Sequence, residues 1–354
     1  MKVGGDSGSF AATVVKWQAA QGRNDLPWQN TRDPYRVWLS EIMLQQTQVV
    51  TVREYFARFL CRCPDVQALA AASLDEVLAL WSGLGYYTRA RNLHRCAQQV
   101  VSEFGSIFPR SSQALETLPG IGRSTAAAIA SLCFGERVAI LDANVKRVVT
   151  RVQGFDADLA KTSHEKALWE VATQLLPSPA QCQDLFTMQR YTQGMMDLGA
   201  MVCLPKKPHC QMCPVQLNCV AHAQGLPEKY PVRTRRLKRS SQSIWLLWAT
   251  RSDGAVWLNP RPAPGVWGGL YCLPVMDSDA MLRASLPSAL QSTVIELPVF
   301  MHVLTHKDLY LHPRCVFLED GNPGDLPGQW FSPSVWPSLG LPAPIRKLLE
   351  RGPA

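Results

Sequence analysis

The chain has 354 residues, of which 47% are hydrophobic, and it carries 36 Lys and Arg against 28 Asp and Glu, a formal net charge of +8. This length allows two or three domains with sizeable cores, and the absence of any run of 18 apolar residues argues against a membrane-spanning helix. The basic balance favours a polyanionic partner without identifying one. The first ten residues are polar and glycine-rich, so no secretory signal is predicted. We therefore expect a cytoplasmic protein, nucleoid-associated if it is bacterial.

The first 225 residues show the apolar spacing of amphipathic helices, and no alternating strand pattern competes with it. Short Gly and Pro segments separate the predicted helices. Helices are predicted over residues 13–20, 35–50, 74–80, 87–104, 123–133, 145–152, 165–176 and 185–196.

The composition changes after residue 225. Residues 226–240 hold six basic residues, one acid and two prolines, which predicts a linker that is either a solvated spacer or a strap facing phosphates. Strands are then predicted over residues 244–249, 256–258 and 315–318, and a closing helix over 343–351. The prediction is a multidomain protein, with an all-α domain at 1–225, a basic linker at 226–240 and a small α+β domain at 241–354.

Glu41 lies on a predicted helix that is apolar nearly all round. Asp33 and Pro34 are suited to the N-cap and first turn of this helix. Burial of a carboxyl group is costly and raises its pKa, which would let Glu41 hold a proton near neutral pH, as a general acid must. The alternative is a side chain that faces solvent or pairs with an arginine such as Arg36.

Residues 118–126 (LPGIGRSTA) join two predicted helices. Gly120 and Gly122 permit positive φ and close approach of the backbone to another surface. The helix that begins near Arg123 presents unpaired N–H groups, which favour anions. The segment matches a helix-hairpin-helix motif, and we expect it to bind a DNA phosphate without reading a base. Any tight helix connection is the alternative.

Asp142 follows the apolar run 138–141 and precedes a predicted helix, as an N-cap residue does. Helix N–H groups also keep such a carboxylate ionised, so Asp142 could stabilise a developing cation while it caps the helix. One neutral and one charged carboxyl group, in Glu41 and Asp142, suit cleavage at the anomeric carbon of a sugar.

Four cysteines in one window, Cys203, Cys210, Cys213 and Cys219, are spaced C-x6-C-x2-C-x5-C. A [4Fe-4S] cluster takes four Cys ligands. Zinc also accepts four thiolates, but its ribbons usually pair two C-x2-C knuckles and this window has one, so the spacing favours the cluster. Disulfides are disfavoured because cytosolic thiols stay reduced.

The hairpin motif, the Asp about 20 residues after it and the cysteine window together resemble the endonuclease III superfamily of DNA glycosylases. The closer resemblance is to MutY-type adenine DNA glycosylases, and it extends over nearly the whole chain. The motifs that carry it are LPW (26–28), VWLSEIMLQQTQV (37–49), GLGYYTRARNLH (83–94), LPGIGRSTA (118–126), ILDANVKRV (140–148), MMDLGAMVC (195–203) and GVWGGLYCLP (265–274).

This resemblance implies roles for several residues. Glu41 would protonate the adenine ring and later activate water, Asp142 would stabilise the oxocarbenium-like transition state, and Asn144 would help to hold it. Ser124 stands where bifunctional relatives carry a lysine nucleophile, and a serine cannot form a Schiff base, so the enzyme should be monofunctional. Tyr86 would act as a wedge beside a flipped base, unless it is ordinary aromatic core. The residues implied to contact DNA are Gln45, Gln46, Tyr86, Gly120, Gly122, Arg123 and Ser124.

The C-terminal domain resembles a Nudix fold that reads 8-oxoguanine. Thr305 and His306 match the recognition loop of the family, in which Leu304 replaces a Phe. Gln29 departs as well, since many relatives place Arg after LPW. No Nudix catalytic box follows Gly265, so hydrolysis of nucleotides is not expected.

The predicted function is therefore monofunctional base excision repair: the enzyme flips out and hydrolyses adenine mispaired with 8-oxoguanine or guanine in double-stranded DNA. It would hold a [4Fe-4S] cluster and act as a monomer without membrane contact. Two alternatives remain. One is an endonuclease III-like glycosylase/lyase, against which Ser124 and Glu41 argue, and the other is a DNA-binding protein without catalytic activity.

Overall fold

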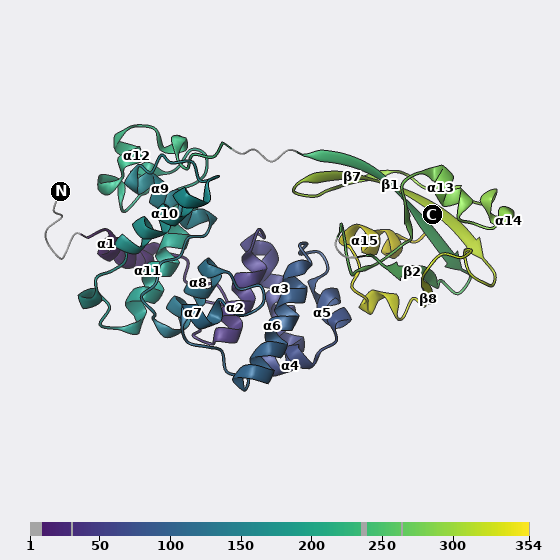
Figure 1. Cartoon of the computed structure of the whole chain (residues 1–354), viewed down its shortest axis with the longest axis horizontal. Coiled ribbons are helices and arrows are strands. Elements are labelled where there is room, and N and C mark those ends of the chain that lie inside the picture. The colour runs from purple at the N-terminus through teal and green to yellow at the C-terminus, as the bar shows by residue number, and fades with distance from the viewer. Residues whose placement is uncertain (1–8, 30, 235–238, 263–264, 354) are drawn as a thin grey trace. The chain divides into compact units, whose positions relative to one another are not determined.

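The computed structural model describes residues 9–29, 31–234, 239–262 and 265–353. By its internal contacts the chain divides into two compact units, residues 1–70 with 95–236 and residues 71–94 with 237–354. The first unit is helical, and the second is built on a mixed β-sheet (Figure 1). No helix within the described ranges has both the length and the apolar content needed to cross a membrane.

The first unit confirms the predicted all-α domain. Each helix predicted within residues 1–225 has a counterpart, although the one predicted over 74–80 lies in the second unit, and short helices join them. Within the basic linker, residues 235–238 lie outside the described residues. The helices are α1 (Phe10–Gln21), α2 (Pro34–Leu44), α3 (Val49–Arg62), α4 (Val66–Ala71), α6 (Thr88–Phe104), α7 (Ser112–Leu115), α8 (Arg123–Phe134), α9 (Ala143–Gln153), α10 (Thr162–Gln174), α11 (Leu185–Asp197) and α12 (Val220–Ala223).

The helix predicted over residues 35–50 is wrong in one respect, because it is two helices, α2 and α3. Gln46 has a φ of 58°, a left-handed conformation that ends a right-handed helix. The apolar spacing continues across this break, so the sequence pattern hides it. The loop between α2 and α3 is free to line the cleft described below.

The centre of the first unit is α8, which packs against α2, α7 and α11. Its residues 126–130 are small or branched apolar side chains that are all buried, so neighbouring helices approach closely. One polar pair crosses the α8–α11 contact, where Ser131 and Thr192 share a buried hydroxyl hydrogen bond of 2.7 Å. As a result, α2 and the segment before α9 both line one cleft, which is described below.

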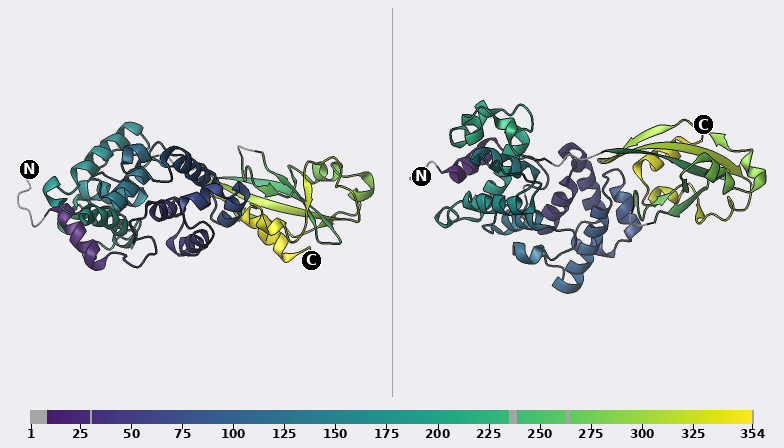
Figure 2. Two further views of the ribbon diagram at one scale, coloured as in Figure 1. Left: turned by 90° about the horizontal axis from the view of Figure 1, so that it is seen from below. Right: turned by 45° about the horizontal axis from the view of Figure 1, so that its top comes forward.

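The second unit confirms the predicted α+β domain. Its long strands β1 (Ser240–Arg251) and β7 (Lys307–Leu318) are parallel neighbours along their whole length, which Figures 1 and 2 both show. The predicted closing helix is α15 (Ala343–Arg351). The other elements are α5 (Leu74–Trp81), β2 (Val256–Pro260), β3 (Tyr271–Cys272), β4 (Val275–Met276), α13 (Asp279–Ala284), α14 (Ser288–Gln291), β5 (Ile295–Glu296), β6 (Phe300–Val303) and β8 (Gln329–Phe331).

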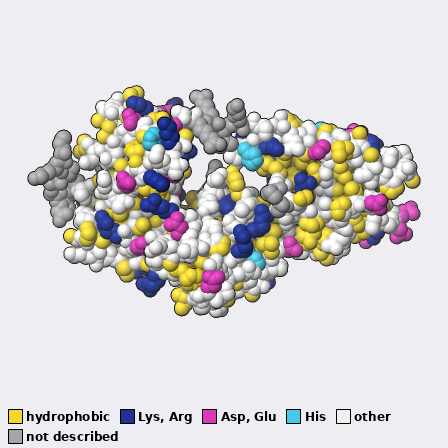
Figure 3. Space-filling view, viewed as in Figure 1, with side chains coloured by type: hydrophobic (Ala, Val, Ile, Leu, Met, Phe, Trp, Pro, Cys, Tyr) yellow, Lys and Arg dark blue, Asp and Glu magenta, His cyan; other side chains and the backbone are white. Residues whose placement is uncertain are grey.

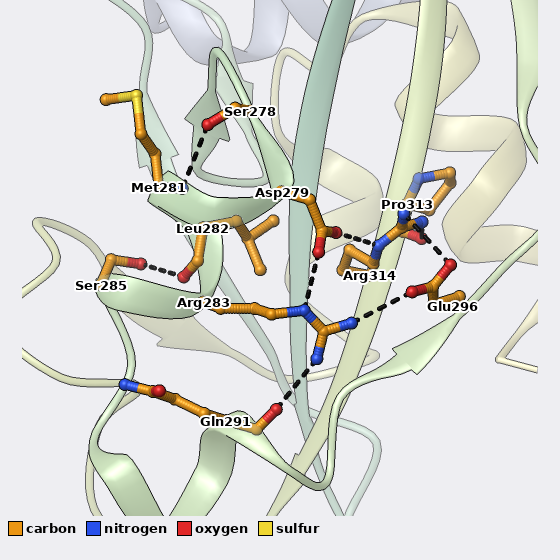
Figure 4. Close-up of polar contacts among 10 residues, drawn as sticks. All are labelled: Ser278, Asp279, Met281, Leu282, Arg283, Ser285, Gln291, Glu296, Pro313 and Arg314. Atoms are coloured by element: carbon orange, nitrogen blue, oxygen red, sulfur yellow. Dashed lines mark hydrogen bonds and ion pairs between the residues drawn. The ribbon is translucent and has the colours of Figure 1, made fainter.

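An ion-pair network fastens α13 to the sheet (Figure 4). Asp279 accepts hydrogen bonds from Arg283 Nε at 2.7 Å and from Arg314 Nε at 2.5 Å. Glu296 on β5 pairs with both arginines, at 3.1 and 3.3 Å. Because two arginines and two carboxylates balance, the mostly buried Arg314 has its charge compensated.

Residues 71–94 pack on the C-terminal domain within the second unit. The Leu341 carbonyl accepts hydrogen bonds from Ser82 Oγ at 3.0 Å and from Tyr87 OH at 3.3 Å. Arg346 Nε donates to Ser82 Oγ at 3.1 Å. The turn that follows α5 is therefore fixed by groups at the far end of the sequence. The domain boundaries drawn from the sequence stay a prediction, and this packing ties an early segment to the C-terminal part.

Candidate active site

A cleft of about 840 Å³ lies in the first unit, between α2, the 45–48 loop and the segments that lead into α8 and α9. It brings together six of the residues predicted from the sequence, namely Glu41, Gln45, Gln46, Ser124, Asp142 and Asn144. The predicted phosphate-binding, cysteine and lesion-recognition residues do not line this cleft, and their places are described below.

Glu41 reaches the cleft from α2, most of whose side chains are buried. Asp33 caps this helix as predicted, because its side chain accepts from Tyr35 N at 2.9 Å. Burial, and to a smaller extent the charge of Asp142, raise the pKa of Glu41 from 4.5 to about 7. Arg36 pairs with Asp33 at 3.6 Å, so the alternative of an Arg36–Glu41 pair is not seen. Glu41 therefore has the protonation behaviour of a general acid.

Asp142 caps α9, as predicted, and accepts from Val145 N at 2.7 Å. Burial raises the pKa of Asp142, while the backbone N–H groups of Val145 and Asn144 and the charge of Arg147 oppose that rise. The cap thus acts in the direction expected, but burial outweighs it. Cationic character on a bound sugar would favour the ionised form of this carboxyl group.

Arg147 and Gly199 hold the first turn of α9, and neither was found from the sequence. Arg147 Nη2 donates to Asn144 Oδ1 at 2.8 Å and to Gly199 O at 2.7 Å, while its Nε donates to Cys203 O at 2.7 Å. Gly199 lies in a π-helical turn (Leu198–Val202) that continues α11. Such turns often mark functional sites, but no sequence pattern distinguishes this one.

A buried carboxylate, Asp197, holds two further side chains of the cleft. Its Oδ1 accepts from Arg23 Nε at 2.7 Å and from Gln193 Nε2 at 2.8 Å, and its Oδ2 accepts from Arg23 N at 3.0 Å. Arg23 and Gln193 both line the cleft. The only sequence signal for this network was an aspartate inside an apolar helical pattern.

Ser124 and the glutamines of the 45–48 loop have distinct environments. Ser124 Oγ accepts from Leu141 N at 3.1 Å, so this hydroxyl fixes the backbone beside Asp142. Gln45 Nε2 donates to Thr125 Oγ1 at 3.4 Å. Gln46 is exposed in its strained left-handed conformation, a feature that tends to persist where it serves a site.

The helix-hairpin-helix segment has the expected turn. Gly120 has a φ of 77°, and Gly122 is the N-cap of α8. A Cβ at Gly122 would meet nothing within 4 Å, so the backbone N–H groups there can be approached closely. The Arg123 guanidinium lies over the Trp169 ring at 4.0 Å. Figure 3 shows Lys and Arg side chains in several separate groups on the visible face, with acidic side chains between them.

The four cysteines Cys203, Cys210, Cys213 and Cys219 line one small cavity beside α9. The buried Arg151 organises its wall, donating to Cys203 Sγ at 3.3 Å and to Leu204 O at 2.6 Å. Across the described residues, no three His, Cys, Asp or Glu side chains lie close enough to hold one metal ion. Four Cys thiols around one cavity are nevertheless the donor set that a [4Fe-4S] cluster takes, so the residue types present fit that group.

The predicted lesion-recognition residues meet in the second unit. Tyr86 is 42% exposed with a φ of 49°, and its hydroxyl hydrogen-bonds Thr305 Oγ1. Tyr86, Thr305 and His306 line one cavity together with Trp267, which also has a positive φ, of 60°. The neighbouring Tyr87 is buried, so of the two tyrosines only Tyr86 is available to a partner.

Comparisons with known proteins agree with this fold. Residues 39–174 match the model of the HhH-GPD superfamily base excision DNA repair proteins, and residues 245–351 match that of NUDIX domains. The chain thus belongs to the helix-hairpin-helix class of DNA repair proteins. It is 34% identical to the adenine DNA glycosylase of Buchnera aphidicola (subsp. Acyrthosiphon pisum), over 96% of this chain and 97% of the relative. The protein is a member of the adenine DNA glycosylase family.

Other relatives match a smaller share of the chain. The human adenine DNA glycosylase is 43% identical over 60% of this chain and 39% of its own length. Among solved structures, a thermostable thymine-DNA glycosylase is 31% identical with a TM-score of 0.52, covering 61% of this chain and 95% of that one. An endonuclease III–DNA complex, 20% identical with a TM-score of 0.50, covers 61% of this chain and 94% of its own and shares the fold.

Proposed function

We propose that the protein is a monofunctional glycosylase that flips adenine out of double-stranded DNA and hydrolyses its N-glycosidic bond, where the adenine is mispaired with 8-oxoguanine or guanine. The observation that carries this proposal is one cleft that holds Glu41, with a pKa of about 7, and Asp142 on the cap of α9. Membership of the adenine DNA glycosylase family supports adenine as the target base.

The two carboxyl groups divide the chemistry. Protonated Glu41 donates to a ring nitrogen of adenine, which makes the base a neutral leaving group. Asp142 then stabilises the positive charge on the sugar as the bond breaks. The Glu41 carboxylate takes a proton from water, whose oxygen adds to the sugar, and this returns Glu41 to its acid form. No lysine is found among the described residues that line the cleft, and Ser124 is engaged with Leu141, which favours hydrolysis over Schiff-base chemistry.

Recognition of DNA would use three separate features. The turn at Gly120 and Gly122 with Arg123 offers backbone N–H groups and charge to a phosphate. Tyr86, held exposed by its hydrogen bond to Thr305, is suited to enter the base stack, and Thr305 and His306 offer polar groups to 8-oxoguanine. The proposed protein acts as a monomer in the cytoplasm, and it is associated with the nucleoid if its source is bacterial.

The cysteine cavity is proposed to hold a [4Fe-4S] cluster bound by Cys203, Cys210, Cys213 and Cys219. A bound cluster would supply a structural cross-link for residues 203–219, which contain little regular structure of their own. Arg151 and Arg147 tie the segment that begins at Cys203 to α9, so order in this loop supports the helix that Asp142 caps.

The test is incubation of the purified protein with a duplex that holds adenine opposite 8-oxoguanine, with and without alkali. Strand cleavage that appears only after alkali supports a monofunctional glycosylase. Cleavage without alkali would instead show a lyase. Binding of the duplex without release of base would show a DNA-binding protein, and the proposal would fail.

A further inference from the structure

The turn at residues 83–86 of the second unit carries the exposed Tyr86 in an unusual backbone conformation. Gly83 and Gly85 have φ values of 106° and 71°, and Tyr86 has a φ of 49°. Glycine adopts positive φ at little cost, but a tyrosine does so only where its surroundings enforce it. Among the described residues, a Cβ at Gly85 would meet nothing within 4 Å, so the outer side of the turn faces open space. The groups that enforce this conformation must therefore act from the inner side.

Two side chains hold the turn from that side through its backbone carbonyl groups. Arg89 Nη2 donates to Leu84 O at 3.1 Å and to Gly85 O at 3.3 Å. Trp81 Nε1 donates to the same Gly85 carbonyl at 3.0 Å. The Arg89 guanidinium also lies over the Tyr86 ring at 5.5 Å and over the Trp81 ring at 5.2 Å. One guanidinium thus contacts both the backbone of the turn and the side chain that the turn carries.

The position of Arg89 is unfavourable for a cation in other respects. Arg89 lies in the first turn of α6, where a positive charge opposes the helix dipole. Burial lowers its pKa to about 10, although the guanidinium stays charged at neutral pH. Neither the helix nor the solvent favours a cation here. The contacts with the turn are what hold the guanidinium in place, and they fix the turn in return.

We propose that Arg89 is a positioning residue that holds the 83–86 turn in the conformation from which Tyr86 enters the base stack, an inference that rests on the proposed function. A flexible turn would have to become ordered while the base leaves the stack, and that loss of entropy would slow the step. A turn that is already fixed avoids this cost. Arg89 lies outside the residues that line the catalytic cleft, so its effect on adenine release would pass through Tyr86.

The experiment measures extrusion of the base directly. Duplexes carry 2-aminopurine, a fluorescent analogue of adenine that brightens on unstacking, opposite 8-oxoguanine. They are mixed rapidly with protein in the Glu41→Gln background, which cannot transfer the proton. Arg89→Met should slow the rise in fluorescence on the order of 10-fold, as expected when the backbone of one further residue must be ordered in that step. Arg95→Met removes an exposed arginine farther along α6 and should leave the rate unchanged.

A second variant keeps the charge at this position. In Arg89→Lys, one ammonium group cannot replace the planar guanidinium that serves the carbonyl groups of both Leu84 and Gly85, so extrusion should slow by a similar factor. This variant also decides the question if Arg89→Met does not fold. Unchanged extrusion in Arg89→Lys would show that the charge alone suffices, and the inference would be overturned.

A third comparison separates positioning from other roles. In a Tyr86→Ala background, Arg89→Met should cause no further loss, because Arg89 acts through that ring. A full further loss would overturn the inference. So would a fall of about one in the slope of log affinity for DNA against log salt concentration, because it would show that Arg89 binds a phosphate directly.

The fluorescence measurement requires no turnover, so it is independent of the proposed activity. A protein that extrudes 2-aminopurine but releases no adenine would defeat the proposed function, and the comparison of Arg89→Met with its parent would still test the inference. If the parent protein gives no rise in fluorescence, the inference is overturned whether or not adenine is released.

Discussion

Gly199 lies directly against Asn144, and a Cβ atom at position 199 would come within 2.6 Å of the Asn144 Cβ. Side-chain carbons do not approach this closely, so any residue other than glycine must displace the first turn of α9 or the π-helical turn behind it. Asp142 caps that first turn. The position of the Asp142 carboxyl group therefore depends on a glycine that does not line the cleft.

Replacement of this glycine should slow catalysis in a protein that still folds. In Gly199→Ala, a displacement of about 1 Å at Asp142 should lower the single-turnover rate of adenine release by roughly 10²-fold, with DNA binding retained. The matched control is Gly225→Ala, which strains a φ of 69° but adds a Cβ in open space. A wild-type rate in Gly199→Ala, with the Gly225→Ala rate also unchanged, would contradict the role of this contact.

Adenine release should depend on the protonation of Glu41. Because its pKa is about 7 and the acid form is the active one, the single-turnover rate should fall as the pH rises through that value. Glu41→Gln keeps the size of the side chain but cannot transfer the proton, so its rate should fall by roughly 10²-fold or more, while the mispair is still bound. A near wild-type rate for Glu41→Gln would remove Glu41 from the mechanism.

The same shift predicts how stability changes with pH. The pKa of Glu41 rises from 4.5 to about 7 on folding, so between these values the folded state binds the proton more tightly than the unfolded state does. The contribution of Glu41 to stability therefore falls as the pH rises from about 4.5 to about 7. Glu41→Gln lacks this contribution. Its Tm relative to wild type should increase between pH 5 and pH 8, and a constant difference would show that Glu41 is not shifted.

The cysteine cavity makes a prediction about composition. Purified protein should absorb broadly near about 400 nm, as iron–sulfur clusters do, and Cys210→Ser should lose iron and DNA affinity together. Cys61→Ser removes an exposed cysteine that lies elsewhere in the chain, so it should keep both. Metal analysis that finds one zinc and no iron in anaerobically prepared protein would decide against the cluster.

Much of the fold follows from short-range patterns that the sequence displays. Asp33 and Asp142 were predicted as helix caps because a cap needs only its own side chain and the next three residues, and both accept the hydrogen bonds expected. The two-helix split at Gln46 was missed because its left-handed φ leaves no mark in the apolar spacing. A helix cap can be predicted from the type of one side chain, whereas this break depends on the backbone conformation of Gln46, which the residue type does not determine.

The supporting residues of the site could not be predicted, because they act between segments far apart in the chain. Asp197 accepts a hydrogen bond from Arg23, which lies 174 residues earlier in the chain. Arg147 donates a hydrogen bond to Gly199, which lies 52 residues later. Neither pair has a sequence spacing that periodicity can detect. The packing of Ser82 on Leu341 is of the same kind, and it changes how the C-terminal domain should be tested.

Removal of everything after Ser240 would expose the face of residues 71–94 that the C-terminal part covers. Tyr87 and Ser82 would lose Leu341, and the turn that carries Tyr86 would lose its support. A truncated protein should therefore lose preference for 8-oxoguanine for two reasons at once. Single-residue changes at the Tyr86–Thr305 hydrogen bond separate lesion reading from this loss of support.

A double-mutant cycle of Tyr86→Phe and Thr305→Ala is the sharper measurement. Each change removes one hydroxyl of the same hydrogen bond, so each should lower the ratio of the single-turnover rate on A:8-oxoguanine to that on A:G. Where a base contact is lost as well, the fall in this ratio should correspond to a free energy of about 1–3 kcal/mol. The double variant should lose less than the sum, because the two hydroxyls act as one unit. Thr234→Ala, at a hydroxyl hydrogen bond to Asp158 in the first unit, serves as the control at the same salt concentration. Strictly additive losses would show that Tyr86 and Thr305 contact the DNA independently, and unchanged ratios would assign discrimination of 8-oxoguanine to the catalytic cleft.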